Sequence, residues 1–149
     1  MQSNSCPNIE EFKEILKKHS LKATPQRLAV HEAMISLGHA SADMVTDEIL
    51  SQNRAKVTLA SVYNILTNLA MLGIYDYRLS SNNKMYFDVN TFDHIHFYDR
   101  ENHSFKDVID DDLISLIRMH LGRKRFKGYK VEGFDIQIIG RPTRKRYGV

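Results

Sequence analysis

The chain has 149 residues, the usual size of one domain or of two small ones, and its 42% apolar and 26% charged residues are ordinary for a globular protein. No apolar run approaches the ~20 residues that cross a bilayer, and residues 1–7 lack the apolar core of a signal peptide, so we expect a cytoplasmic protein with no membrane partner. The single cysteine, Cys6, excludes an internal disulfide and a thiolate-rich zinc site within one chain.

The net charge of +3 is unevenly distributed along the chain. Residues 85–112 are strongly acidic, whereas the chain from residue 118 onward is strongly basic and closes with the tail RPTRKRYGV. This asymmetry fits a nucleic-acid partner for the basic parts and a cation for the acidic centre. A tail that only improves solubility is the alternative.

The first 73 residues have the spacing and the start signals of helices. Apolar residues recur at helical spacing in IEEFKEILKKH. Thr24, Ser41 and Thr58 are predicted N-caps, and Gly38 and Gly73 are predicted ends. The three capped helices are PQRLAVHEAMISL, ADMVTDEILSQN and LASVYNILTNLAML.

After Gly73 the pattern changes to short strands. IYDYRLS and KMYFDV predict a hairpin, VNTFD a connector, and HIHFYD, SFKDV, DDLISLIRMHL and GFDIQIIG a strand–strand–helix–strand module. We therefore predict an α+β fold with an N-terminal winged-helix DNA-binding domain (residues 1–88), a hinge (89–93) and a small α/β domain (94–149). The second domain is too small to bury much surface alone, so pairing with another copy is expected.

The predicted fourth helix carries no charged residue. At 100° per residue, one arc holds the expected core residues Val62, Ile65, Leu66, Leu69 and Leu72. The opposite arc holds small and amide side chains: Ala60, Ser61, Tyr63, Asn64, Thr67 and Asn68. Such a face suits insertion into a DNA major groove, although a helix buried on both sides is the alternative. Phosphate or minor-groove contacts are predicted for Lys22, Arg27, Arg78 and Lys84.

Two histidines, His94 and His96, lie one residue apart in a predicted strand and therefore project from the same face. An isolated pair of this kind is often incidental, but here Asp88 precedes it, Asp107 lies on the neighbouring strand and His39 lies in a loop before the third helix. Three imidazoles and two carboxylates form a mixed nitrogen and oxygen set that suits Fe²⁺, Mn²⁺, Zn²⁺ or Co²⁺.

Together these segments resemble the ferric uptake regulator family of metal-dependent repressors. The resemblance rests on LKATPQRLAV, the loop histidine before ASADMV, SVYNIL and the Asp–His-x-His–Asp series, and it runs from about Leu21 to Gly140. It implies a winged-helix domain, a C-terminal dimerisation domain and a homodimer on a palindromic operator. The family's regulatory ligands fall on His39, Asp88, His94, His96 and Asp107, its base-contacting tyrosine on Tyr63, and its loop lysine on Lys22.

Several positions depart from the family pattern. Asp99 and Asn102 occupy the places of a zinc-binding cysteine pair, so no structural zinc at a four-cysteine site is expected. Asn64 stands where the family often has arginine. Asp93 and Ile95 occupy part of the family's additional histidine-rich site, and no second metal is assigned. Aspartates at both carboxylate ligand positions resemble the peroxide-sensing branch, in which bound iron oxidises ligand histidines.

The sequence thus predicts a regulator, not an enzyme, acting as a repressor of iron-uptake or peroxide-stress genes. One divalent ion per subunit, Fe²⁺ or Mn²⁺ in function and Zn²⁺ as purified, would fix the operator-binding arrangement. The alternatives are a metal-independent DNA-binding dimer, a haem-responsive one using Cys6-Pro7, and a small metal-dependent hydrolase using Asp88, His94 and His96. The hydrolase lacks a nucleophile and a phosphate-cradling loop.

Overall fold

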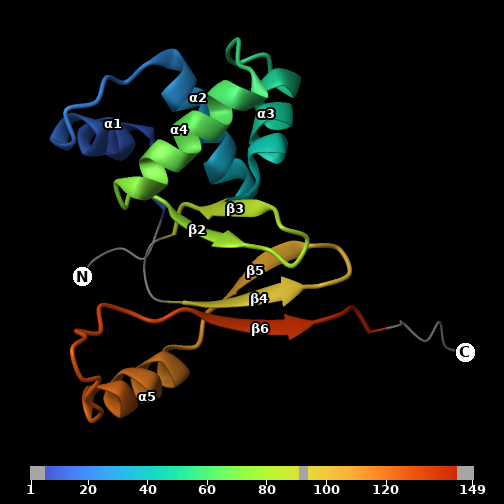
Figure 1. The fold of residues 1–149 in the computed structure, drawn as a ribbon. Helices are drawn as coiled ribbons and strands as arrows, with labels where there is room; N and C mark the ends of the chain where they lie inside the picture. The colour runs from blue at the N-terminus through green and yellow to red at the C-terminus, as the bar shows by residue number, and fades with distance from the viewer. Residues whose placement is uncertain (1–5, 91–93, 144–149) are drawn as a thin grey trace, which may run out of the picture. The chain divides into compact units, whose positions relative to one another are not determined.

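The computed structural model describes residues 6–90 and 94–143, and the chain divides into two compact units, residues 1–91 and 92–149 (Figure 1). The last three residues of the predicted hinge, including Asp93, lie outside the described part, as do residues 144–149 of the basic tail. Among the described residues, no helix has the length and apolar character needed to cross a bilayer.

The N-terminal unit is built from four helices: α1 (Ile9–Lys18), α2 (Pro25–Leu37), α3 (Ala42–Ser51) and α4 (Leu59–Met71). The predicted caps are confirmed, because the side chains of Thr24, Ser41 and Thr58 each accept a hydrogen bond from a backbone N–H in the first turn. Helix α2 ends before Gly38, whose φ of 76° lies in the region that favours glycine.

The buried core of this unit is formed by the inner faces of the four helices. From α4 it takes Val62, Leu66 and Leu69, as predicted, and Ile65 packs against it while partly buried. The expectation that Leu72 is a core residue is wrong, since it is 41% exposed. Leu72 is the C-cap of α4, where the helix has already ended and its periodicity no longer directs the side chain inward.

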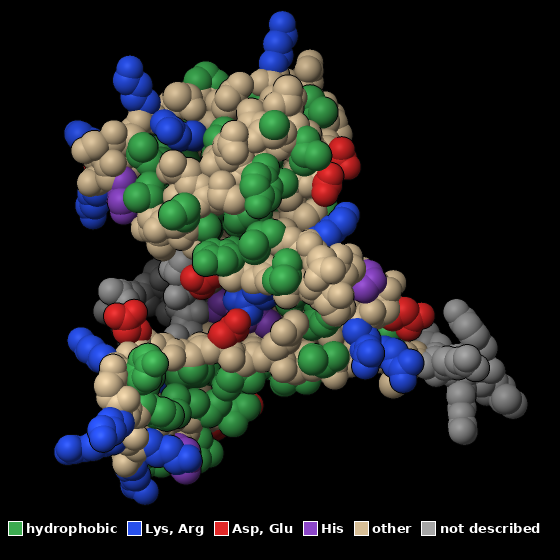
Figure 2. Space-filling view, in the orientation of Figure 1, with side chains coloured by type: hydrophobic (Ala, Val, Ile, Leu, Met, Phe, Trp, Pro, Cys, Tyr) green, Lys and Arg blue, Asp and Glu red, His purple; other side chains and the backbone are tan. Residues whose placement is uncertain are grey.

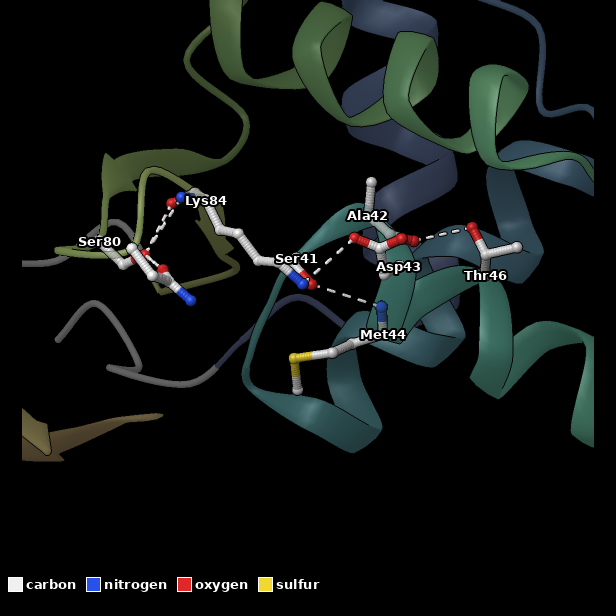
Figure 3. A network of polar contacts seen from close by, with 8 residues as sticks. Ser41, Ala42, Asp43, Met44, Thr46, Ser80 and Lys84 are labelled. Carbon is white, nitrogen blue, oxygen red and sulfur yellow. Dashed lines mark hydrogen bonds and ion pairs between the residues drawn. The ribbon is translucent and has the colours of Figure 1, made fainter. Parts of the chain in front are cut away.

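A three-stranded antiparallel sheet completes the N-terminal unit, in the order β1–β3–β2. Strands β2 (Asp76–Leu79) and β3 (Met85–Asp88) form the predicted hairpin. Strand β1 (His39–Ala40) was expected as a loop, and two residues are too few for a strand pattern in the sequence. Lys84 at the hairpin lies 3.7 Å from the Asp43 carboxylate at the start of α3, so an ion pair connects the wing to the helices (Figure 3).

The C-terminal unit is a sheet with the strand order β5–β4–β6 and one helix. Its elements are β4 (Ile95–Asp99), β5 (Ser104–Val108), α5 (Asp111–Gly122) and β6 (Ile136–Gly140). Strand β4 pairs antiparallel with β5 and parallel with β6. Helix α5 buries only Ile114, and hydrophobic side chains lie on the unit's surface over α5 and the following loop (Figure 2).

Candidate metal centre and DNA-binding helix

The N-terminal unit holds one pair of the predicted ligands. His39 on β1 lies directly opposite Asp88 on β3, and the His39 Nδ1 and Asp88 Oδ2 atoms are 3.3 Å apart. Asp88 is 1% exposed, and its Oδ1 accepts a hydrogen bond from the Asn90 backbone N–H at 2.9 Å. Because a carboxylate so deeply buried is stable as an anion only beside a positive or hydrogen-bonding partner, these neighbours hold Asp88 in place, and the pair is a candidate half-site for a cation.

The C-terminal unit brings the other three predicted ligands together. His96 on β4 lies opposite Asp107 on β5, and His94 just precedes β4. One Asp107 oxygen lies 3.1 Å from His94 Nε2 and 3.9 Å from His96 Nε2. The two imidazole centroids are 4.2 Å apart, as expected for residues i and i+2 of a strand. The histidines are 6% and 2% exposed, so the three side chains form a largely buried cluster, the second candidate half-site.

A further carboxylate, Asp135, was missed by the sequence reasoning. Its Oδ1 lies 3.5 Å from His96 Nδ1, whereas Asp107 is near the other ring nitrogen, Nε2. Asp135 comes directly before β6, whose first residue, Ile136, pairs with Ile95. Asp135 is 39 positions after His96 in the sequence, so no local pattern indicates that the two are neighbours, and only the β4–β6 pairing shows it.

The donor sets in the two units fit a divalent transition metal. Neutral imidazoles and carboxylates are the side chains that Fe²⁺, Mn²⁺ and Zn²⁺ accept, and the described residues offer no thiolate here. The rings and carboxylates are already fixed by strand pairing and burial, so little ordering is needed for binding. His39 and Asp88 could hold an ion from one unit, and His94, His96 and Asp107 from the other.

Asp99 and Asn102, the two positions where the sequence lacks the zinc-binding cysteines, are joined to each other by hydrogen bonds. The Asp99 carboxylate accepts hydrogen bonds from the backbone N–H groups of Glu101 and Asn102 and from the Asn102 side chain, at 2.8–3.1 Å. The hydrogen bonds from Asn102 hold the pKa of Asp99 below its ordinary value. The turn between β4 and β5 is therefore closed by hydrogen bonds within the chain.

Helix α4 presents its predicted uncharged arc to solvent. Tyr63 is 46% exposed, and Asn64 and Asn68 are also exposed. The Ser61 hydroxyl has a local role as well, since it accepts from the Thr58 N–H at 3.0 Å and donates to the Thr58 carbonyl. The alternative of a helix buried on both sides is therefore wrong in this unit. Tyr63, Asn64 and Asn68 remain the side chains best placed to reach a partner.

The four cations predicted to hold phosphates have different surroundings. Lys22 is exposed, and its carbonyl accepts from the Arg27 guanidinium at 2.8 Å. Lys84 is about half exposed beside Asp43, whereas Arg78 is partly buried with its Nε inaccessible. Of the four, Lys22 and Lys84 are thus the exposed cations, and Lys84 is paired with Asp43.

Cys6 and its surroundings do not favour a reactive thiol. The side chain is partly buried against the helical core, and burial, followed by the negative charges of Asp88 and Glu11, raises its pKa. Beside it, the Pro7 carbonyl accepts a hydrogen bond from the fully buried His31 ring, a contact that the sequence reasoning also missed. A thiol whose pKa is raised is a poor metal or haem ligand at neutral pH.

A winged-helix unit with an uncharged exposed helix, followed by an α/β dimerisation unit that carries a His-x-His half-site, defines a class of metal-responsive DNA-binding regulators. Residues 18–138 match the model of the Ferric uptake regulator family, and the protein belongs to this family.

Relatives cover most of the chain. A ferric uptake regulation protein homolog from Archaeoglobus fulgidus is 28% identical over 116 residues, which cover 76% of this chain and 88% of that protein. The peroxide stress regulator of Campylobacter jejuni is 28% identical with a TM-score of 0.67, over 89% of this chain and 96% of that one. The ferric uptake regulator of Vibrio cholerae shares the fold at a TM-score of 0.73 and 21% identity, over 88% and 99%.

Proposed function

We propose that the protein is a cytoplasmic, metal-dependent repressor that binds a palindromic DNA operator as a homodimer. One divalent ion per chain, Fe²⁺ or Mn²⁺ in function, would be shared by His39, Asp88, His94, His96 and Asp107. The observation that carries the proposal is the pair of buried, strand-fixed half-sites, one in each unit, each too small alone to complete an ion's coordination.

The mechanism follows from where the ligands lie in the chain. His39 and Asp88 belong to the unit that carries α4, whereas His94, His96 and Asp107 belong to the other unit, beyond the predicted hinge. When bound, the ion would supply the positive charge and directional bonds that hold both ligand sets at once. We take this arrangement to be the one that fits the operator. An ion that binds it ~100-fold more tightly than other arrangements would then stabilise it by about 2.7 kcal/mol.

Dimer formation is supported by the apolar surface of the C-terminal unit. Exposed apolar side chains lie on α5 and on β6: Leu113, Leu116, Met119, Ile138 and Ile139. A helix that buries one residue against its own unit needs another surface for its apolar side. A second copy would cover this face and place two α4 helices on one duplex, which is the geometry that a palindromic operator requires.

The stimulus is proposed to be iron, with peroxide as the second candidate. The second candidate, peroxide, is supported by the 28% identity to the Campylobacter jejuni peroxide stress regulator and by aspartate at both carboxylate positions, Asp88 and Asp107. The iron-loaded protein would then gain oxygen on a ligand histidine after exposure to hydrogen peroxide. Mass spectrometry of peptides containing His39 or His94 distinguishes iron sensing from peroxide sensing. A protein that senses only iron should show no added oxygen on these peptides.

A metal-independent DNA-binding dimer and a haem-responsive one are the rivals within this fold. DNA binding that is unchanged by a chelator would select the first. The raised pKa of Cys6 argues against haem ligation by this thiol. The hydrolase alternative would require turnover of generic ester or phosphate substrates.

The experiment compares DNA binding by the metal-free and Mn²⁺-loaded protein, using a duplex selected from a random pool by the loaded form. We expect Mn²⁺ to tighten binding by about 100-fold in the parent and to have no effect in His96→Ala. His120→Ala, which removes an exposed histidine of α5, is the matched control and should behave as the parent. A His96→Ala protein that binds the duplex as tightly as the parent, with and without metal, would overturn the proposal.

A further inference from the structure

His96 is flanked by carboxylates at both ring nitrogens. Its Nε2 faces Asp107 at 3.9 Å, within the half-site, and its Nδ1 faces Asp135 at 3.5 Å. The His96 side chain is 3% exposed and its Nδ1 is inaccessible to solvent, whereas Asp135 is 60% exposed. The His96 ring is therefore buried, whereas the Asp135 carboxylate near its Nδ1 lies at the surface.

We propose that Asp135 is a positioning residue for the metal centre, which fixes the ring of His96 and the nitrogen that it offers to an ion. This inference rests on the proposed metal site. Asp135 is not a ligand in this arrangement, because a single imidazole cannot direct Nδ1 and Nε2 at the same ion. Its carboxylate lies 3.5 Å from Nδ1, within ion-pair range, and a small approach on metal binding would let it accept the Nδ1 proton. The lone pair would then be on Nε2, the nitrogen that faces Asp107.

The backbone fixes this arrangement in two steps. Parallel pairing of β6 with β4 sets His96 opposite Gln137 and Ile95 opposite Ile136, so Asp135 enters the sheet beside the histidine pair. Antiparallel pairing with β5 then sets Asp107 opposite His96. Asp107 lies in β5 and Asp135 directly before β6, the two strands that flank β4, and each carboxylate lies near a different nitrogen of the same ring.

The chemical consequence is a stronger ligand. A carboxylate that accepts a proton from the far nitrogen makes an imidazole more basic and holds its tautomer and its orientation before the ion arrives. Removing such a partner lowers metal affinity by about 10–100-fold in other metal sites. Because Asp135 is outside the buried core, its loss should leave the fold of the metal-free protein intact.

The test is a competitive titration of the full-length protein with Mn²⁺ or Co²⁺ against a chelator of known affinity. Asp135→Ala is expected to weaken binding by about 10–100-fold, and Asp135→Glu to recover part of the loss. The matched control is Glu132→Ala, which removes an exposed carboxylate from the same loop and should bind as the parent. The visible absorption bands of bound Co²⁺ report the orientation of its ligands. They should shift in Asp135→Ala and stay at the parent's wavelengths in Glu132→Ala.

Thermal unfolding of the metal-free variants separates positioning from folding, and Asp135→Ala should melt with the parent. An affinity within twofold of the Glu132→Ala control overturns the inference. If in that case His94→Ala still loses the metal, the proposed metal site stands without Asp135. A parent that binds neither ion overturns both the site and the inference.

Discussion

His31 shows at the residue scale how the N-terminal segment is attached to the helical core. Its ring is fully buried, stacks on Phe12 with the centroids 3.9 Å apart, and contacts the Tyr75 hydroxyl at 2.6 Å and the Pro7 carbonyl at 2.7 Å. Burial raises the pKa of Tyr75 well above its ordinary value, so the hydroxyl keeps its proton and donates it to Nδ1. His31 Nε2–H then donates to Pro7, and the neutral ring satisfies both neighbours.

This arrangement predicts a pH-dependent stability. Burial lowers the pKa of His31, against the opposing effect of the Pro7 carbonyl, so the unfolded chain binds a proton more readily than the folded one. The contribution of His31 to the free energy of unfolding should be fully present above about pH 6.5 and decline as the pH falls through the window between 6.5 and the lowered pKa. Urea unfolding at pH 8 and pH 5.5 measures this decline.

His31→Leu supplies the control for that prediction. At pH 8 it should lower the free energy of unfolding by roughly 1–3 kcal/mol, since the buried Tyr75 hydroxyl loses its acceptor. Its stability should also fall less than that of the parent between pH 8 and pH 5.5. Equal declines in the two proteins would contradict a neutral buried imidazole at this position.

At the scale of single elements, the exposed arc of α4 predicts a DNA contact that does not affect folding. Tyr63→Ala should weaken binding to the selected duplex by roughly 1–3 kcal/mol, because a base-edge contact is lost. Its thermal midpoint should stay near that of the parent, since the ring is 46% exposed. Fluorescence anisotropy measures the binding. Tyr129→Ala, at an 83% exposed tyrosine of the other unit, is the matched control and should leave the affinity unchanged.

The turn between β4 and β5 gives a second prediction at this scale. Asn102→Ala removes a side-chain hydrogen bond of 2.8 Å to the Asp99 carboxylate. We expect a small loss in the free energy of unfolding at neutral pH, because solvent screens a hydrogen bond at an exposed carboxylate. Because these bonds hold the pKa of Asp99 low, the loss should shrink as acid protonates this carboxyl. A variant as stable as the parent at neutral pH would show that the turn is held by strand pairing alone.

The elements that could be predicted from the sequence are those specified by local pattern. Thr24, Ser41 and Thr58 mark helix starts through contacts three residues away, and the hairpin after Gly73 is likewise local. The missed features depend on distant pairing. Strand β1 exists because β3 lies beside it, and Asp135 reaches His96 because β6 pairs in parallel with β4. Side-chain periodicity carries no information on such partners.

At the scale of the whole molecule, the exposed apolar face of the C-terminal unit predicts a dimer. Leu116→Glu with Ile139→Glu places two charges on side chains that are 58% and 61% exposed in the single chain. Each charge should leave the unit folded but block pairing, because a buried unpaired charge is costly. Sedimentation equilibrium should then show a monomer with weakened duplex binding. The matched control is Leu50→Glu, at a 53% exposed leucine of α3, which should remain dimeric. If the double variant is dimeric as well, the interface lies elsewhere.

The proposed metal ligands in the two units can regulate DNA binding only if metal and operator affinities are coupled. Thermodynamic linkage requires that the factor by which metal tightens DNA binding equals the factor by which DNA tightens metal binding. The most direct measurement is therefore the Mn²⁺ affinity of the parent with and without a saturating amount of the selected duplex. We predict that the duplex tightens Mn²⁺ binding by about 100-fold, matching the proposed effect of the metal on DNA binding. Equal Mn²⁺ affinities in the two conditions would contradict the account.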